Sequence, residues 1–204
     1  MIGVPGTIDN DINGTDYTIG FDTALNTIVE AIDNIRDTAA SHHRIFLVEV
    51  MGNNSGLLAL CAAAASGARE AFLPEKKEDL EEIKKSIGQA IAANRSSIIV
   101  VSEGDQVGGA HELYKYLADH GLGEKIRVSV LGHIQRGGSP TYRDRLNATL
   151  FGERAVGALL QGKSNLMVGI MDGKLALNDL SISQVKKSPQ NMDYLKLIRK
   201  LSVY

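Results

Sequence analysis

The chain has 204 residues, of which 44% are hydrophobic and 23% are charged, and its formal net charge is -2. This composition is ordinary for a globular protein with a sizeable core, and the near-neutral charge gives no support to nucleic-acid binding or a membrane-surface role. No apolar stretch reaches the ~20 residues of a membrane span, and residues 1–20 lack a signal-peptide pattern. The single cysteine, Cys61, fits a reducing, cytoplasmic compartment.

Helical and strand patterns alternate along the chain, which predicts an α/β fold with three α/β/α layers and mainly parallel sheets. The expected strands are 2–5, 45–50, 71–73, 97–102, 126–131, 167–170 and 174–177. The expected helices are 21–35, an Ala-rich helix after residue 56, 76–93, one ending near 120, one beginning at 139–140, and 191–201. Thr18 is expected to cap the first helix, and Ser139-Pro140 to begin the fifth.

The stretch from Pro5 to Ile12 places two carboxylates, Asp9 and Asp11, in a turn directly after an apolar strand. Ligands of open α/β sheets bind where strands end and loops begin. A carboxylate there can accept a proton from an alcohol, while a second one can orient it or position a metal ion. From these residues alone, the alternative is that both aspartates only cap backbone amides of the turn.

Further motifs follow this stretch in the same order and with nearly the same spacing as in one enzyme family, at 14–24, 41–44, 48–52, 102–104 and 131–140. Over most of its length the sequence resembles the phosphofructokinase family. The resemblance implies a glycolytic kinase that transfers a phosphoryl group from ATP, with Mg²⁺, to the 1-hydroxyl of fructose 6-phosphate. It also implies an allosteric homotetramer.

By the same resemblance, the chain corresponds to the carboxyl-terminal portion of the family's subunit. The glycine-rich segments that bind nucleotide phosphate and magnesium in the family do not occur in it, so the first nucleotide-binding half is expected to be missing. ATP and Mg²⁺ are then held largely by that half, and this chain alone is expected to be inactive. The expected domains are the catalytic strand and loop (1–17), the sugar-phosphate domain (18–131), and the return to the nucleotide domain with the C-terminal helix (132–204).

The resemblance assigns Asp9 as the base that takes the proton of the sugar hydroxyl, Asp11 as its partner, and Thr7 as a contact to the transferred phosphoryl group. The substrate-binding positions it implies are Arg44, Met51, Gly52, Asn53, Glu103, Arg127, His133 and Arg136. Guanidinium groups suit bidentate phosphate binding. Two of these arginines, Arg44 and Arg127, are expected to reach the site of a neighbouring subunit.

The sequence departs from the family's pattern at positions that affect the catalytic rate, the effector regulation and the choice of phosphoryl donor. Asn53 replaces a charged arginine, which predicts a lower rate unless another cation compensates. Arg36 matches a phosphate-binding position of the effector site, but Arg69 stands where the family has a magnesium-binding glutamate, so the effector response stays open. Gly6 replaces the lysine of pyrophosphate-dependent relatives and favours ATP. The alternatives are a pyrophosphate-dependent enzyme and a non-catalytic sugar-phosphate-binding or assembly fragment.

Overall fold

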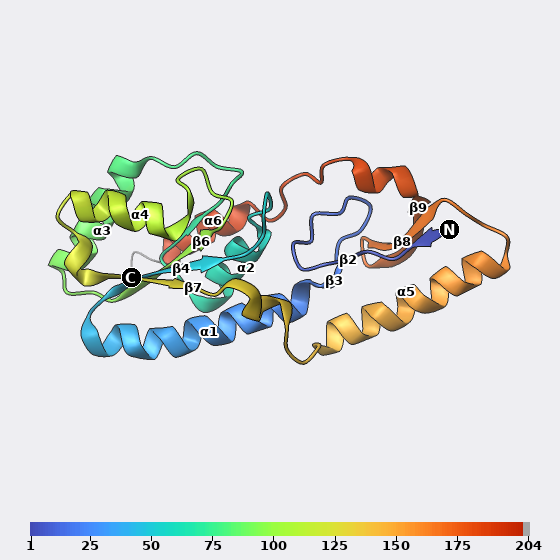
Figure 1. Cartoon of the computed structure of the whole chain (residues 1–204), viewed down its shortest axis with the longest axis horizontal. Helices are drawn as coiled ribbons and strands as arrows, with labels where there is room; N and C mark the ends of the chain where they lie inside the picture. Colours follow the sequence, from blue (N-terminus) through green and yellow to red (C-terminus); the bar gives the residue numbers. More distant parts are fainter. Residues whose placement is uncertain (202–204) are drawn as a thin grey trace. The chain divides into compact units, whose positions relative to one another are not determined.

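The computed structural model describes residues 1–201 and divides the chain into two compact units (Figure 1). Unit 1 comprises Met1–Asn26 and Arg136–Ser188, and unit 2 comprises Thr27–Gln135 and the chain from Pro189 onward. Each unit is therefore built from two separate stretches. The last helix belongs to unit 2, whereas the resemblance grouped it with the stretch that begins at residue 132. The functional domain division stays a prediction.

Unit 2 contains a four-stranded parallel sheet with the strand order β5-β6-β4-β7 (Figure 1). Its strands are Ile45–Val50 (β4), Glu70–Phe72 (β5), Ser97–Ser102 (β6) and Ile126–Val130 (β7). Ile45 at the start of β4 pairs with Ser97 of β6 and Ile126 of β7, so these three strands begin level. The four predicted strands of this sheet are confirmed to within one residue at each end, because buried parallel strands have nearly continuous apolar sequences. The predicted strand 2–5 is shorter, Ile2–Gly3.

Helices cover both faces of this sheet and form the predicted three layers. The helices of unit 2, the first of which begins in unit 1, are Phe21–His42 (α1), Leu57–Ser66 (α2), Leu80–Ala92 (α3), Gly109–Asp119 (α4) and Asp193–Leu201 (α6). A buried cluster joins α3 and α4 to one face, and Ile98 and Val100 of β6 lie outside it, on the face where α2 packs. None of the helices within residues 1–201 is long and apolar enough to cross a membrane.

Three helices begin later than the sequence predicts: α6 begins at Asp193 instead of residue 191, and α3 and α5 begin after a capping side chain. The carboxylate of Asp79 accepts the backbone amides of the second and third residues after it, at 3.0 and 3.3 Å, so α3 begins at Leu80 instead of residue 76. The helix α5 (Tyr142–Leu160) begins after Thr141, whose hydroxyl caps it, and the predicted start at Ser139-Pro140 is wrong. In both cases a local cap fixes the first turn.

Unit 1 contains a three-stranded sheet and a separate two-stranded one. In the first, β1 (Ile2–Gly3) pairs in parallel with β8 (Leu166–Met171), which forms an antiparallel hairpin with β9 (Lys174–Asp179). The second pairs β2 (Gly6–Thr7) with β3 (Ile19–Gly20). The short 3-10 helices of the chain are Gly123–Lys125 (η1), Gly132–Arg136 (η2) and Leu180–Gln184 (η3). The core of unit 1 contains Phe151 of α5 packed with Val168 of β8.

Candidate active site

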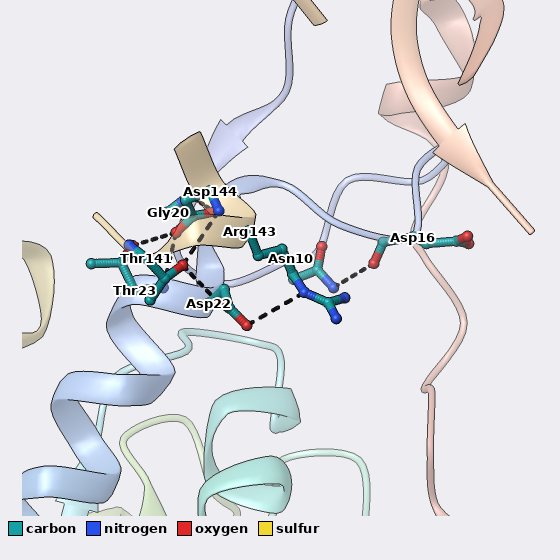
Figure 2. A network of polar contacts seen from close by, with 8 residues as sticks. All are labelled: Asn10, Asp16, Gly20, Asp22, Thr23, Thr141, Arg143 and Asp144. Carbon is teal, nitrogen blue, oxygen red and sulfur yellow. Dashed lines mark hydrogen bonds and ion pairs between the residues drawn. The ribbon is translucent and has the colours of Figure 1, made fainter. Parts of the chain in front are cut away.

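The loop between β2 and β3 carries Asp9 and Asp11 and is closed from inside by one buried asparagine. Asn10 is only 2% exposed. Its side-chain nitrogen donates to the carbonyl of Asp16 at 2.8 Å (Figure 2), and its Oδ1 accepts the backbone amide of Thr18 at 2.9 Å. These bonds join the two ends of the loop, so the backbone positions of the two neighbouring aspartates are fixed.

Thr7 and Asp9 are brought together at the beginning of this loop. The backbone amide of Asp9 donates to Oγ1 of Thr7 at 3.2 Å, and the side chain of Asp9 is half-buried. Asp11 is exposed. The Thr7 hydroxyl is thus bonded to the backbone of Asp9, and the sequence puts a hydroxyl and a carboxylate two residues apart, which suits a phosphoryl contact beside a proton acceptor.

The start of α1, directly after this loop, is capped by an aspartate from another helix. Asp144 of α5 is 3% exposed, and its carboxylate accepts the backbone amides of Gly20 at 3.0 Å and Thr23 at 2.9 Å, together with the Thr23 hydroxyl (Figure 2). The prediction that Thr18 caps this helix is wrong, because its hydroxyl donates to the carbonyl of Thr7. Sequence reasoning missed Asp144 because 121 residues separate it from Thr23.

In unit 2, four of the expected substrate-binding residues meet where β4 and β6 end. Oε1 of Glu103, after β6, accepts the amides of Gly52 at 3.3 Å and Asn53 at 2.9 Å, which follow β4. No side chain fits at Gly104, because a Cβ there would lie 1.8 Å from the carbonyl oxygen of Asn53. Met51, the residue before this turn, is buried. The four residues form one cluster at the carboxyl edge of the parallel sheet, where such sheets bind ligands.

A buried glutamine, which sequence reasoning missed, joins His133 to the same edge. Gln135 is 1% exposed, its Oε1 accepts the amide of Met51 at 3.0 Å, and its Nε2 donates to the carbonyl of Gly132 at 2.9 Å. His133 lies in the turn that these bonds hold, and it is exposed. Arg136, at the end of the same turn, is also exposed. The only signal in the sequence was the position of this glutamine inside the glycine-rich motif.

The structure does not bring Arg44 and Arg127 to this edge. Arg44 directly precedes β4, and Arg127 is the second residue of β7, paired with Phe46 near the start of β4. Both arginines therefore lie toward the amino edge of the sheet, and the length of β4 puts Met51 about 23 Å from Arg44 and about 17 Å from the level of Arg127. Nη1 of Arg127 donates to two carbonyls of its own turn, at 3.0 and 2.7 Å. A single sugar phosphate cannot contact both edges of one sheet.

Arg36 lies in a separate pocket of unit 2, with a volume of about 490 Å³. Arg69 and Arg95 line the same pocket, and none of its described lining residues is acidic. The guanidinium of Arg36 donates to the carbonyl of Ser66, and Nη2 of Arg69 donates to Oγ of Ser86 at 3.2 Å. The position that departs from the family's pattern, Arg69, thus adds positive charge beside Arg36. The chemistry of this pocket suits an anion.

Residues 1–201 contain no group of three or more His, Cys, Asp or Glu side chains placed to hold a metal ion. Mg²⁺ typically keeps several waters and takes one or two carboxylates together with substrate phosphates. The side chains described here do not form a complete cage for it.

Comparison with known proteins shows what the chain is related to. The model of the family described as Phosphofructokinase matches residues 1–159. The chain belongs to the phosphofructokinase family. It is 47% identical over 208 residues to ATP-dependent 6-phosphofructokinase 1 of Thermus thermophilus, a match that covers 100% of this chain and 63% of that relative. The chain thus spans less than two thirds of the length of this phosphofructokinase.

Solved phosphofructokinases have the same fold. The phosphofructokinase of Saccharomyces cerevisiae matches with a TM-score of 0.79 and 36% identity, over 90% of this chain and 26% of that one. The pyrophosphate-dependent phosphofructokinase of Marinobacter aquaeolei matches with a TM-score of 0.80 and 26% identity, over 97% of this chain and 59% of that one. These structures confirm the phosphofructokinase-like α/β fold with mainly parallel sheets.

The capping role of Asp144 can be tested by its replacement. Asp144→Ala is expected to lower the free energy of unfolding of unit 1 by about 2 kcal/mol, because two half-buried amides lose a charged acceptor. Urea unfolding followed at the NMR amide signals of unit 1 measures this loss. Glu153→Ala, at an exposed position of the same helix, is the control and should cost less than ~0.5 kcal/mol. Equal effects of the two substitutions would contradict the capping role.

Proposed function

We propose that this chain supplies the general base and the sugar-phosphate contacts of an ATP-dependent 6-phosphofructokinase. The observation that carries the proposal is the closed loop that fixes Asp9 beside Thr7 in a member of this family. In the proposed reaction, the 1-hydroxyl oxygen of fructose 6-phosphate attacks the terminal phosphorus of ATP while Asp9 accepts the hydroxyl proton, and the bond from that phosphorus to the bridging oxygen breaks, so that ADP leaves. The hydroxyl of Thr7 donates to the transferred phosphoryl group, and Asp11 assists as the second carboxylate.

We assign the sugar to the carboxyl edge of the unit 2 sheet. The carboxylate of Glu103 has lone pairs beyond those that accept the turn amides, and these can accept hydrogen bonds from sugar hydroxyls. Met51 and Gly52 form one wall of the proposed sugar site. His133 and Arg136 contribute polar contacts to the sugar phosphate, and Asn53 contributes an uncharged amide. Because Asn53 has a φ of 50°, a conformation that asparagine tolerates better than most residues, the turn itself suits this side chain.

The positions of Arg44 and Arg127 support a site shared between subunits of a homo-oligomer. The family resemblance implies that this oligomer is a tetramer. Both lie at the amino edge, roughly 20 Å from the carboxyl edge of the same sheet. The 6-phosphate bound at one subunit's carboxyl edge is therefore out of their reach within that subunit. We propose that they bind the 6-phosphate of a neighbouring subunit's substrate.

The observations favour ATP as the phosphoryl donor. We propose a cytoplasmic location for the enzyme. A Cβ at Gly6 would meet no atom within 4 Å, so this position leaves open space beside the catalytic loop. The relative with higher identity is named as ATP-dependent, and the pyrophosphate-dependent neighbour is less similar. Mg²⁺ would accompany the nucleotide and neutralise phosphate charge, and we assign no ligand for it in this chain. A non-catalytic sugar-phosphate-binding fragment is the remaining alternative.

Activity is best measured on a completed chain, defined as this sequence joined to the segment of the Thermus thermophilus relative that it does not match. The 204-residue chain alone is expected to show no kinase activity, because it contains no recognisable nucleotide-phosphate loop. The completed chain supplies the reference rate for each substitution below. It also distinguishes a loss of activity caused by the missing nucleotide segment from one caused by a failure of the proposed chemistry.

Loss of the base should act on the chemical step. In the completed chain, Asp9→Asn is expected to lower kcat at least ~100-fold while the KM for fructose 6-phosphate changes less than ~3-fold. A coupled assay for fructose 1,6-bisphosphate measures both constants. Asp172→Asn is the matched control, because it removes an exposed carboxylate of unit 1 at a positive φ that asparagine also adopts. An unchanged kcat in Asp9→Asn would reject this residue as the base.

Loss of an amino-edge arginine should act on sugar-phosphate binding. In the completed chain, Arg127→Ala is expected to weaken fructose 6-phosphate binding at least ~10-fold, the size of one charge-assisted contact, and to leave ATP binding unchanged. Isothermal titration measures both affinities. Lys125→Ala, an exposed cation two residues away, is the control and should change neither affinity.

Mixed oligomers test whether Arg127 acts in the neighbouring site. When Arg127→Ala subunits are mixed with Asp9→Asn subunits, some sites combine an intact Asp9 with an intact Arg127 from the other parent. Activity above that of both parents supports the shared site. If mixed oligomers form and none recovers activity, Arg127 does not serve a neighbouring site.

We also propose that the pocket around Arg36 is an effector site for a phosphorylated anion. Inorganic phosphate added to the 204-residue chain should shift the NMR amide signals of Ser97 and Ile98, which line the pocket. Arg69→Ala should weaken this binding ~10-fold, as expected for loss of one charged contact. Arg154→Ala, an exposed arginine of α5, is the control. Equal phosphate affinity in Arg69→Ala and the unmodified chain would place the anion elsewhere.

A further inference from the structure

Lys187, which no sequence motif singled out, binds the backbone of the loop that carries Asp9 and Asp11. Its ammonium donates to the carbonyl of Thr15 at 2.7 Å, of Asn10 at 3.1 Å and, more weakly, of Asp16 at 3.5 Å. An ammonium has three N–H donors, so these carbonyls can use all of them. The contacts join parts of unit 1 that lie 171 to 177 residues apart in the sequence.

A backbone contact brings the segment after η3 to the same loop. Lys186 forms an isolated antiparallel bridge with Ile12, inside the loop. The side chain of Lys186 is exposed, whereas that of Lys187 is half-buried and turned to the loop. Two adjacent lysines thus share the same backbone environment, and only one of them reaches the loop with its side chain.

The bonds of Lys187 complement those of Asn10 and do not duplicate them. The Asn10 side chain closes the loop from inside through Asp16 and Thr18, while the Asn10 carbonyl points to Lys187. Burial lowers the pKa of Lys187, and the carboxylates of Asp16 and Asp11 act in the opposite direction. A half-buried ammonium bonded to three carbonyls, with two carboxylates nearby, resists displacement from the loop.

We infer that Lys187 is a positioning residue for catalysis, which holds the backbone of residues 10–16 and through it the orientation of Asp9 and Asp11. The inference rests on the proposed function, in which Asp9 is the base. Lys187 contacts loop carbonyls, so its effect on the reaction passes through the loop. Because small misplacements of a catalytic group cost large factors in rate, a loosened loop should lower turnover more than substrate affinity.

Amide hydrogen exchange in the 204-residue chain tests the contact without any activity. Lys187→Met is expected to raise exchange of the protected amides within residues 9–18 at least ~10-fold, with less than ~2-fold change in α5. Lys186→Met is the matched control and should leave the loop unchanged. Lys187→Arg, which keeps charge and several donors, should retain part of the protection, and Lys187→Gln replaces the methionine variant if that variant does not fold. Unchanged loop exchange, or a uniform increase across unit 1, would overturn the inference.

Kinetics of the completed chain test the catalytic consequence. Lys187→Met is expected to lower kcat ~10-fold while the KM for fructose 6-phosphate changes less than ~2-fold, and Lys186→Met should change neither. An unchanged kcat, or a change confined to KM, would overturn the positioning role. If the unmodified completed chain has no kinase activity, the proposed function fails, whereas the exchange experiment still decides whether Lys187 holds the loop.

Discussion

One buried carboxamide, that of Asn10, fixes the loop on which the proposed chemistry depends. Its Nδ2 donates to the carbonyl of Asp16 and its Oδ1 accepts the amide of Thr18, so it ties the beginning of the loop to its end, and leaving either partner buried without a bond would cost about 1–3 kcal/mol. Its φ of 50° is one that asparagine adopts readily. Asp144 binds backbone amides of the chain directly after the loop, and Lys187 binds carbonyls of the loop itself. Asn10 and Lys187 therefore hold the backbone of the loop that carries Asp9.

The parallel sheet of unit 2 separates two groups of the residues proposed to bind substrate. Strand β4 begins beside Arg44 and ends before Met51, so its direction places the arginine proposed to bind phosphate at one edge and the turn of Glu103 at the other. A strand of six residues is too long for one sugar phosphate to bridge. The need for neighbouring subunits thus follows from strand direction, provided that these residues bind the same ligand.

The sequence was sufficient for the apolar strands of the unit 2 sheet, whereas the helix expected at 21–35 extends to His42. The strands 45–50 and 97–102 are as predicted, because buried parallel strands are continuous apolar runs. It failed at polar tertiary contacts: the cap of α1 comes from Asp144 instead of Thr18, and Gln135 and Lys187 bind backbone groups far away in the sequence. No local pattern distinguishes such a side chain from an exposed one. The family motifs identified the loop of Asp9, but the residues that hold it became visible only in the structure.

We propose that the closed loop places the carboxylate of Asp9 next to the 1-hydroxyl of the sugar. A crystal structure of the completed chain with fructose 6-phosphate and a non-hydrolysable ATP analogue measures this directly. The predicted result is a carboxylate oxygen of Asp9 within about 2.6–3.2 Å of the 1-hydroxyl oxygen, with Asn10 still bonded to Asp16 and Thr18. A 1-hydroxyl hydrogen-bonded to a different carboxylate, with Asp9 directed away from the sugar, would contradict it.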